Sequence, residues 1–272
     1  MADLPKANVA AAKAFVSISI DVDADVDATS HSAACVSTSS QQSAIESVTA
    51  QLIAHSDQSR MPATWAFSSF ATPAVRRIAD SATGHELALL SDAKLGKTEL
   101  SRGDIMQNVV HPLQMAGELG HDITTLAVPQ AWQPRHFDLL TKYGVTVIRT
   151  PHVFSSQTTT GIRAVCHGLW QVPVSVSMQT NGWIANLGQW RNVRRAVDFA
   201  VCEGGWCHLR IDAASIARGD VGAGLRNVAR LLEHLYHVRS AGHISIETLR
   251  AAAVRLSPKR SAAPAGSILR AA

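Results

Sequence analysis

The chain lacks long apolar runs and has few cysteines, and each absence excludes a class of protein. No apolar run among its 272 residues approaches the roughly 20 needed to cross a bilayer as a helix. Asp3, Lys6 and Lys13 interrupt the first residues, which therefore make a poor secretory signal. The four cysteines are too few for a disulfide framework. We therefore expect a cytoplasmic protein without a membrane span.

A strong charge of one sign is also absent. The formal net charge is +4 and the pI is about 9.1, but the basic residues are scattered. Their densest groups are 191–195 and 259–260, which are typical of solvated surfaces rather than of a nucleic-acid site. A composition with 46% hydrophobic and 17% charged residues excludes a disordered or fibrous chain. Nucleic acid is therefore not an expected partner.

Apolar residues recur with the periods of strands and helices in alternation. Residues 14–23 alternate as a strand does, and residues 44–55 carry one apolar helical face. The pattern predicts further strands at 64–68, 85–90, 122–128, 145–149, within 163–178 and at 205–211, and helices at 72–80, 101–119, 133–143, 190–203, 222–240 and within 243–256. Strand followed by helix, repeated about seven times, predicts a parallel α/β sheet closed or nearly closed into a barrel. We expect one domain over 14–256, with flexible ends at 1–13 and 257–272.

An acidic run, Ser-Ile-Asp-Val-Asp-Ala-Asp-Val-Asp at 19–27, follows the first predicted strand. Asp21 and Asp23 fall at its carboxyl end, where the working residues of such barrels gather. Two residues apart, they project to the same side roughly 7 Å from each other, so that one cation or substrate could meet both. An EF-hand calcium loop is excluded, because Val26 replaces the turning glycine and Ser32 replaces the bidentate Glu.

Five short motifs follow one another in a recognisable order. They are Phe-Val-Ser-Ile-Ser-Ile-Asp-Val-Asp at 15–23, Pro-Ala-Thr-Trp-Ala-Phe at 62–67, Gly-His-Glu-Leu-Ala at 84–88, Pro129 with the helix that follows it, and Trp-Cys-His-Leu at 206–209. Together they resemble the polysaccharide deacetylases of the NodB-homology type, carbohydrate esterase family four. The resemblance spans about residues 14–255 and implies an irregular (β/α)7 barrel.

The resemblance also implies roles for three residues. In this family one Asp is the general base, a second Asp and two His hold a divalent metal, and a His on the last strand is the acid. Asp21 would be the base, Asp23 the metal ligand and His208 the acid. A metal with an open position lowers the pKa of its bound water to about 7 and polarises the acetamide carbonyl.

The chain departs from the family pattern at the metal. The two ligand histidines should lie five and nine residues beyond His85, where Leu90 and Lys94 stand. Leucine donates nothing, and a lysine ammonium has no lone pair and repels a cation. His85 itself lies about 16 Å from the rim and is expected to be structural. The arginine that orients the family's base falls near Ala127, and its absence removes a second catalytic part.

These departures predict a degenerate deacetylase, a pseudoenzyme without a metal or other cofactor that binds a glycan or a glycan-processing partner. Lys94 would replace the lost cation by pairing with Asp21 or Asp23. Pro129 and Trp132 are expected in the pocket, where Trp132 either stacks on a sugar ring or caps the barrel core. Two alternatives stay open. One is an active N-deacetylase that holds a metal such as zinc through Asp23, and the other is a purely structural subunit.

Overall fold

The computed structural model describes most of the predicted domain. The described residues are 14–23, 39–91, 101–128, 136–151, 162–165, 168–178 and 183–256, without the side chains of 183–189. The predicted flexible ends at 1–13 and 257–272 lie outside the described residues, as do Lys94, Pro129 and Trp132.

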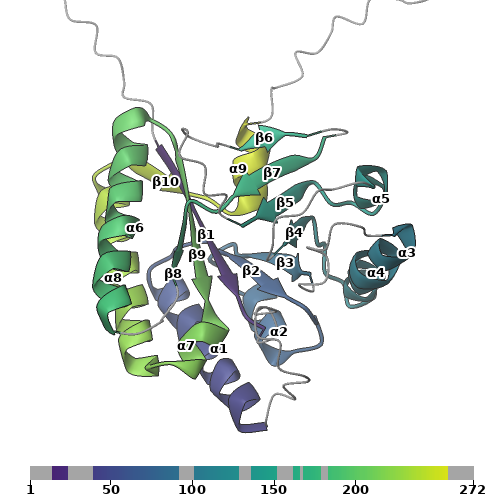
Figure 1. Cartoon of the computed structure of the whole chain (residues 1–272), viewed down its shortest axis with the longest axis horizontal. Helices are drawn as coiled ribbons and strands as arrows, with labels where there is room; N and C mark the ends of the chain where they lie inside the picture. Colours follow the sequence, from purple (N-terminus) through teal and green to yellow (C-terminus); the bar gives the residue numbers. More distant parts are fainter. Residues whose placement is uncertain are drawn as a thin grey trace, which may run out of the picture.

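One mixed sheet runs through the described residues (Figure 1). Its strands are β1 (Ala14–Asp21), β2 (Thr64–Phe67), β3 (Glu86–Leu90), β4 (Thr125–Ala127), β5 (Val147–Thr150), β6 (Arg163–Ala164), β7 (Trp170–Pro173), β8 (Val176–Met178), β9 (Trp206–Asp212) and β10 (Ile244–Ile246). They follow the order β6-β7-β5-β4-β3-β2-β1-β9-β8, with β10 beside β1.

The pairing pattern confirms an α/β sheet that curves as an open half-barrel. The pairs along the sheet are parallel, and the short β6–β7 pair is antiparallel. Within the described residues no pairing joins β8 to β6 or β7, so the sheet stays open between these edges. Parallel neighbours place the carboxyl ends of β1 to β5 and β9 at one rim.

Helices surround the sheet (Figure 1). They are α1 (Ser39–Gln58), α2 (Pro73–Ala79), α3 (Arg102–Ile105), the π-helical turn η2 (Met106–Val110), α4 (His111–Glu118), α5 (Phe137–Lys142), α6 (Trp183–Glu203), α7 (Ala213–Arg218), α8 (Val221–Ser240) and α9 (Leu249–Leu256). Helix α9 differs from those on the outside in that it packs on the inner face of the sheet, against Val147 and Val172. None of these helices combines the length and the apolar character that a bilayer crossing requires, within the part of the chain that the structure describes.

Two local features differ from the sequence prediction. The helix expected at 101–119 is divided by η2, next to Pro112, which has no N–H to bond the preceding turn. The short helix α7 was not predicted. It begins directly after β9, where the carboxylate of Asp212 caps it by accepting a hydrogen bond from the Ser215 amide at 2.8 Å.

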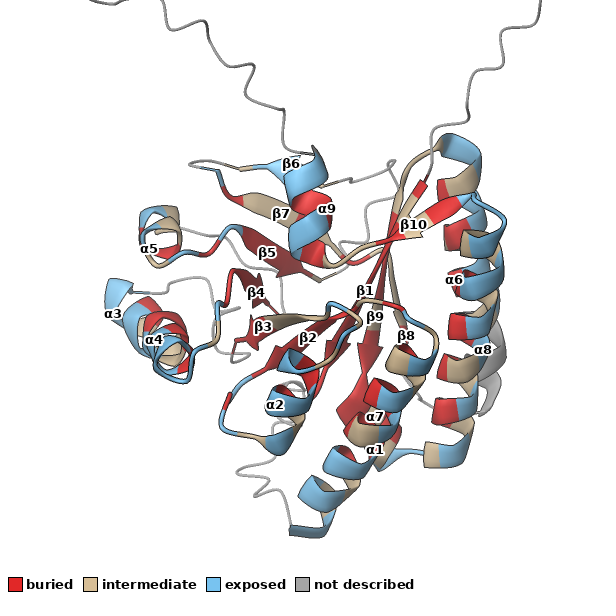
Figure 2. Ribbon diagram, turned by 180° about the vertical axis from the view of Figure 1, so that it is seen from behind, coloured by how far each residue is buried: buried red, intermediate tan, exposed pale blue. Residues whose placement is uncertain are grey.

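β1 is buried on both faces, and its apolar and polar side chains lie on opposite faces of the sheet. Ile18 and Ile20 belong to the same buried apolar cluster as Ile45 and Leu52 of α1. Figure 2 shows the sheet as a buried layer beneath helices with exposed outer surfaces. Because side chains alternate along a strand, the serines and the aspartate of β1 point to the inside of the half-barrel, where they need polar partners.

Candidate functional site

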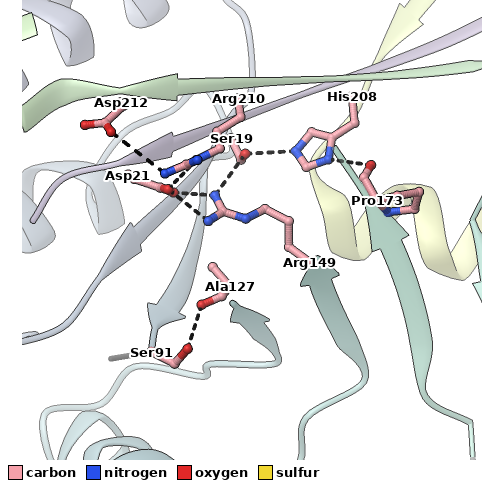
Figure 3. A network of polar contacts seen from close by, with 9 residues as sticks. All are labelled: Ser19, Asp21, Ser91, Ala127, Arg149, Pro173, His208, Arg210 and Asp212. Carbon is pink, nitrogen blue, oxygen red and sulfur yellow. Dashed lines mark hydrogen bonds and ion pairs between the residues drawn. The ribbon is translucent and has the colours of Figure 1, made fainter. Parts of the chain in front are cut away.

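Asp21, the last residue of β1, lies inside the half-barrel between two arginines (Figure 3). Arg149 of β5 binds both carboxylate oxygens, with Nη1 on Oδ1 and with Nη2 at 2.9 Å from Oδ2. Arg210 of β9 donates from Nε to Oδ2 at 2.7 Å. Only 1% of the Asp21 side chain is exposed. Burial alone would raise the pKa of Asp21, but the two guanidinium groups lower it to about 2.

Ser19 connects this ion cluster to His208. Ser19 Oγ lies 2.8 Å from Nε2 of His208 and accepts a hydrogen bond from Arg149 Nη1 at 3.2 Å. The other ring nitrogen, Nδ1, lies 3.1 Å from the carbonyl oxygen of Pro173. Because that carbonyl can only accept, Nδ1 carries the proton and Nε2 accepts from the Ser19 hydroxyl. Burial, together with the nearby Arg149 charge, lowers the pKa of His208 to about 3, and the ring is neutral at pH 7.

His208 lies deeper in the half-barrel than Asp21. The register pairs His208 with Ser17, whereas Asp21 is paired with Asp212. Four strand residues correspond to about 13 Å along the sheet, so His208 is set back from the rim by that distance. Its side chain is fully buried, and it reaches the cluster through Ser19. The residue of β9 that is paired in register with Asp21 is Asp212, and His208, the predicted acid, lies four residues before it.

Arg149 is the residue that the sequence analysis missed. An arginine was expected near position 127, and its loss appeared to remove the partner of Asp21. In the sheet, however, Ala127 is paired in register with Arg149 of the next strand, which supplies the guanidinium. The inference that this part is missing is therefore wrong. The sequence does contain one indication of this pairing, namely a single arginine within the buried strand Val-Ile-Arg-Thr. Because an unpaired buried charge is very costly, such an arginine is expected to have a buried acidic partner.

Apolar side chains occupy the neighbouring interior positions. Ala66, which is paired in register with Asp21, forms a buried cluster with Ala88, Leu90 and Ala127. Leu90 stands where the resemblance implies a ligand histidine, and it is 2% exposed. Nowhere in the described residues do three or more His, Cys, Asp or Glu side chains gather as a metal site would require.

The remaining predicted site residues are placed only in part. Asp23 is half-buried just beyond β1, and its carboxylate accepts a hydrogen bond from the backbone amide of Ser68. Lys94 lies outside the described residues, so its pairing with Asp23 stays a prediction. At Asp21, the positive charge that Lys94 was expected to supply comes from Arg149 and Arg210. Pro129 and Trp132 also lie outside the described residues.

The position of His85 agrees with its predicted structural role. It lies at the amino end of β3, where Nδ1 accepts a hydrogen bond from the Ala63 amide at 3.1 Å and Nε2 contacts Asp57 at 3.1 Å. Both ring nitrogens are therefore occupied far from the rim, and His85 is not available to a metal beside Asp21.

Comparison with known proteins identifies the fold. No family model and no curated protein sequence matches the chain. Among solved structures, a candidate polysaccharide deacetylase from Mycobacterium smegmatis superposes with a TM-score of 0.62 at 15% identity, over 91% of this chain and 96% of that one. The chain has the polysaccharide deacetylase fold.

Other proteins with this fold differ in what they do. PuuE allantoinase matches with a TM-score of 0.60 at 13% identity, over 88% of this chain and 89% of its own. BA3943 from Bacillus anthracis, a pseudoenzyme of carbohydrate esterase family four, matches with a TM-score of 0.53 at 9% identity, over 89% of this chain and 66% of that one. The deacetylase fold therefore occurs in enzymes of different substrates and in a pseudoenzyme, and the site must decide between these roles.

Proposed function

We propose that this protein is a non-catalytic member of the deacetylase fold that binds a carbohydrate or a glycan-processing protein. The observation that carries the proposal is the second arginine on Asp21: beside Arg149, which takes the place of the arginine that orients the family's base, Arg210 also binds the carboxylate. A general base works best when its pKa lies near the working pH, whereas the pKa of Asp21 is about 2. Both of its oxygens are already hydrogen-bonded to guanidinium groups, and the side chain is closed to solvent.

The chemistry of the described side chains does not fit a catalytic divalent cation beside Asp21. The guanidinium groups of Arg149 and Arg210 are cations and would repel such an ion. Leu90 has no lone pair, and its neighbours in the interior are alanines. A cation would have to displace both arginines from a buried carboxylate and leave their charges without a partner. We therefore propose that the protein works without a metal.

Metal content and acetate release test the absence of catalysis. After incubation with zinc, cobalt or nickel and removal of the free ion, we expect substoichiometric metal by mass spectrometry. We also expect no acetate from chitooligosaccharide, with an active family four carbohydrate esterase as the positive control. Stoichiometric metal together with acetate release would instead establish the alternative, an active N-deacetylase.

Carbohydrate binding is tested through Trp132. If this residue stacks on a sugar ring, Trp132→Ala should weaken binding to the glycans selected on an array by about tenfold, which corresponds to about 1.4 kcal/mol. Trp132→Phe keeps an aromatic face and should retain most of the affinity. Binding that is unchanged in both variants would contradict a stacking role, and the absence of any glycan signal would leave the protein-partner half of the proposal to be tested by co-purification.

A further inference from the structure

A separate cavity lies on the outer side of the sheet, between the ends of β1 and β2 and the helices α1 and α2. Figure 1 shows these two helices at that end of the sheet. The volume of the cavity is about 160 Å³. Its wall on α1 is formed by residues that recur every three or four positions and thus share one helical face, namely Gln42, Ile45, Glu46, Thr49, Ala50 and Ile53.

The interior of this cavity is apolar. Ile45 and Ile53 of α1 face Phe67 of β2 and Ala74 of α2 across it. Apolar cavities of about 150 Å³ accept a body of the size of benzene, or about six non-hydrogen atoms. The cavity thus has room for one aliphatic or aromatic side chain.

Charges of both signs stand at the exposed edge of the cavity. Glu46 projects from α1 and Arg77 from α2, and both are exposed lining residues. Glu46 accepts a weak hydrogen bond from Gln42 at 3.4 Å, and neither charge forms an ion pair within the described residues. The half-buried carboxylate of Asp23 adds a second negative charge to the lining. A ligand that is complementary to this edge carries both an ammonium and a carboxylate.

One buried polar group of the wall also lacks a partner. Thr49 is fully buried, and its hydroxyl has no hydrogen bond among the described residues. Buried hydroxyl groups are nearly always paired, because an unpaired one loses its hydration without compensation. Thr49 lies three residues after Glu46 on α1, on the same helical face. A polar ligand group that binds Glu46 would therefore lie next to the Thr49 hydroxyl.

We propose that this cavity binds a free α-amino acid with an apolar side chain. The side chain fills the space between Ile45, Ile53 and Phe67. Glu46 binds the α-ammonium group, and Arg77 binds the α-carboxylate with two parallel hydrogen bonds. The cavity lies outside the half-barrel, whereas the cluster around Asp21 lies inside it. The inference therefore does not depend on the proposed function.

Calorimetric titration of the full-length protein with L-phenylalanine and L-leucine tests the inference. Each amino acid should give a saturable heat. Two analogues keep the phenyl ring and remove one charge each: phenethylamine lacks the carboxylate, and 3-phenylpropanoate lacks the ammonium. Both analogues should bind at least about tenfold more weakly than phenylalanine.

A neighbouring arginine provides the matched control. Arg77→Gln should weaken phenylalanine binding by about tenfold and leave phenethylamine binding unchanged, because only the carboxylate contact is lost. Arg76→Gln changes an equally exposed residue of α2 that does not line the cavity, and it should leave both affinities unchanged. In addition, Ala74→Leu should fill the cavity and abolish binding, with circular dichroism to confirm that the variant is folded.

Several outcomes would overturn the inference. One is the absence of heat with both amino acids at millimolar concentration. Another is equal binding of phenylalanine and phenethylamine, which would show an apolar cavity without recognition of the carboxylate. The third is an equal effect of Arg77→Gln and Arg76→Gln. The arginine variants alter exposed side chains, so they decide the question even if Ala74→Leu does not fold.

Discussion

Replacing Arg149 with methionine should lower the free energy of unfolding by about 3–5 kcal/mol. The substitution leaves the Asp21 carboxylate buried with Arg210 as its remaining charged partner, and it also removes a hydrogen bond to Ser19. Methionine has a similar length and is apolar, so the effect of the lost charge exceeds that of the lost packing. Urea unfolding followed by tryptophan fluorescence, with linear extrapolation to water, measures the change.

An exposed ion pair of the same chemistry is the control. Arg102 donates to Asp138 at 3.0 Å, but 57% and 58% of the two side chains are exposed. Arg102→Met should therefore lower the free energy of unfolding far less than Arg149→Met does, since water screens the pair. A similar small loss in Arg149→Met would contradict the role that we give to the buried cluster.

The double variant separates the charge interaction from other effects. In Asp21→Asn/Arg149→Met no uncompensated carboxylate remains beside the methionine. The combined loss should therefore be smaller than the sum of the two single losses by about 1–3 kcal/mol. Additive losses would mean that the two side chains stabilise the protein independently.

Acidification below pH 6.5 should destabilise the protein, mainly because of His208. The pKa of this ring is about 3 in the folded protein, against an ordinary value of 6.5. Between these two values the unfolded chain binds a proton that the folded protein excludes, so the free energy of unfolding falls as the pH falls. At 1.36 kcal/mol per pH unit, the contribution of His208 to the loss from about pH 7.5 to about pH 4 is about 3 kcal/mol. Asp21, whose pKa is about 2, adds a loss only below its ordinary value of 3.8.

Substitution of His208 assigns this pH dependence. His208→Gln removes the titrating ring and keeps one acceptor for Ser19 and one donor for Pro173. Urea unfolding between about pH 4 and pH 7.5 should show a much flatter dependence in this variant, whatever its stability at neutral pH. Burial also lowers the pKa values of His85 and His234, which add to the slope, and raises those of Glu86 and Asp212, which oppose it, so the slope that remains is the balance of these groups.

An unchanged slope in His208→Gln would contradict the neutral buried histidine. It would mean that the ring gains a proton in the folded protein as easily as in the unfolded chain. The hydrogen bond from Nδ1 to Pro173 and the short contact of Nε2 with Ser19 argue for the neutral form, because an imidazolium would place a proton on both nitrogens.

The sequence alone determined the order of the elements. The periodicity of apolar residues located β1, α1 and α8 within a few residues. Each of these elements buries one regular face, and the residues of that face recur at a fixed spacing in a short stretch of sequence. The motif order indicated the deacetylase fold, which the structural comparison supports. Helix α7 escaped prediction because six residues contain less than two full turns, and its cap depends on the position of Asp212 at the end of β9.

Only the tertiary structure decided how the candidate site is neutralised. Asp21 was recognisable from its place after an apolar strand. Arg149, however, is 128 residues away in the chain, and no local pattern indicates that strand register brings it beside Ala127 and onto the carboxylate. The depth of His208 likewise follows from its register with Ser17. Sequence patterns record which face of an element is buried, whereas the partner of a buried charge is fixed by pairing between distant strands.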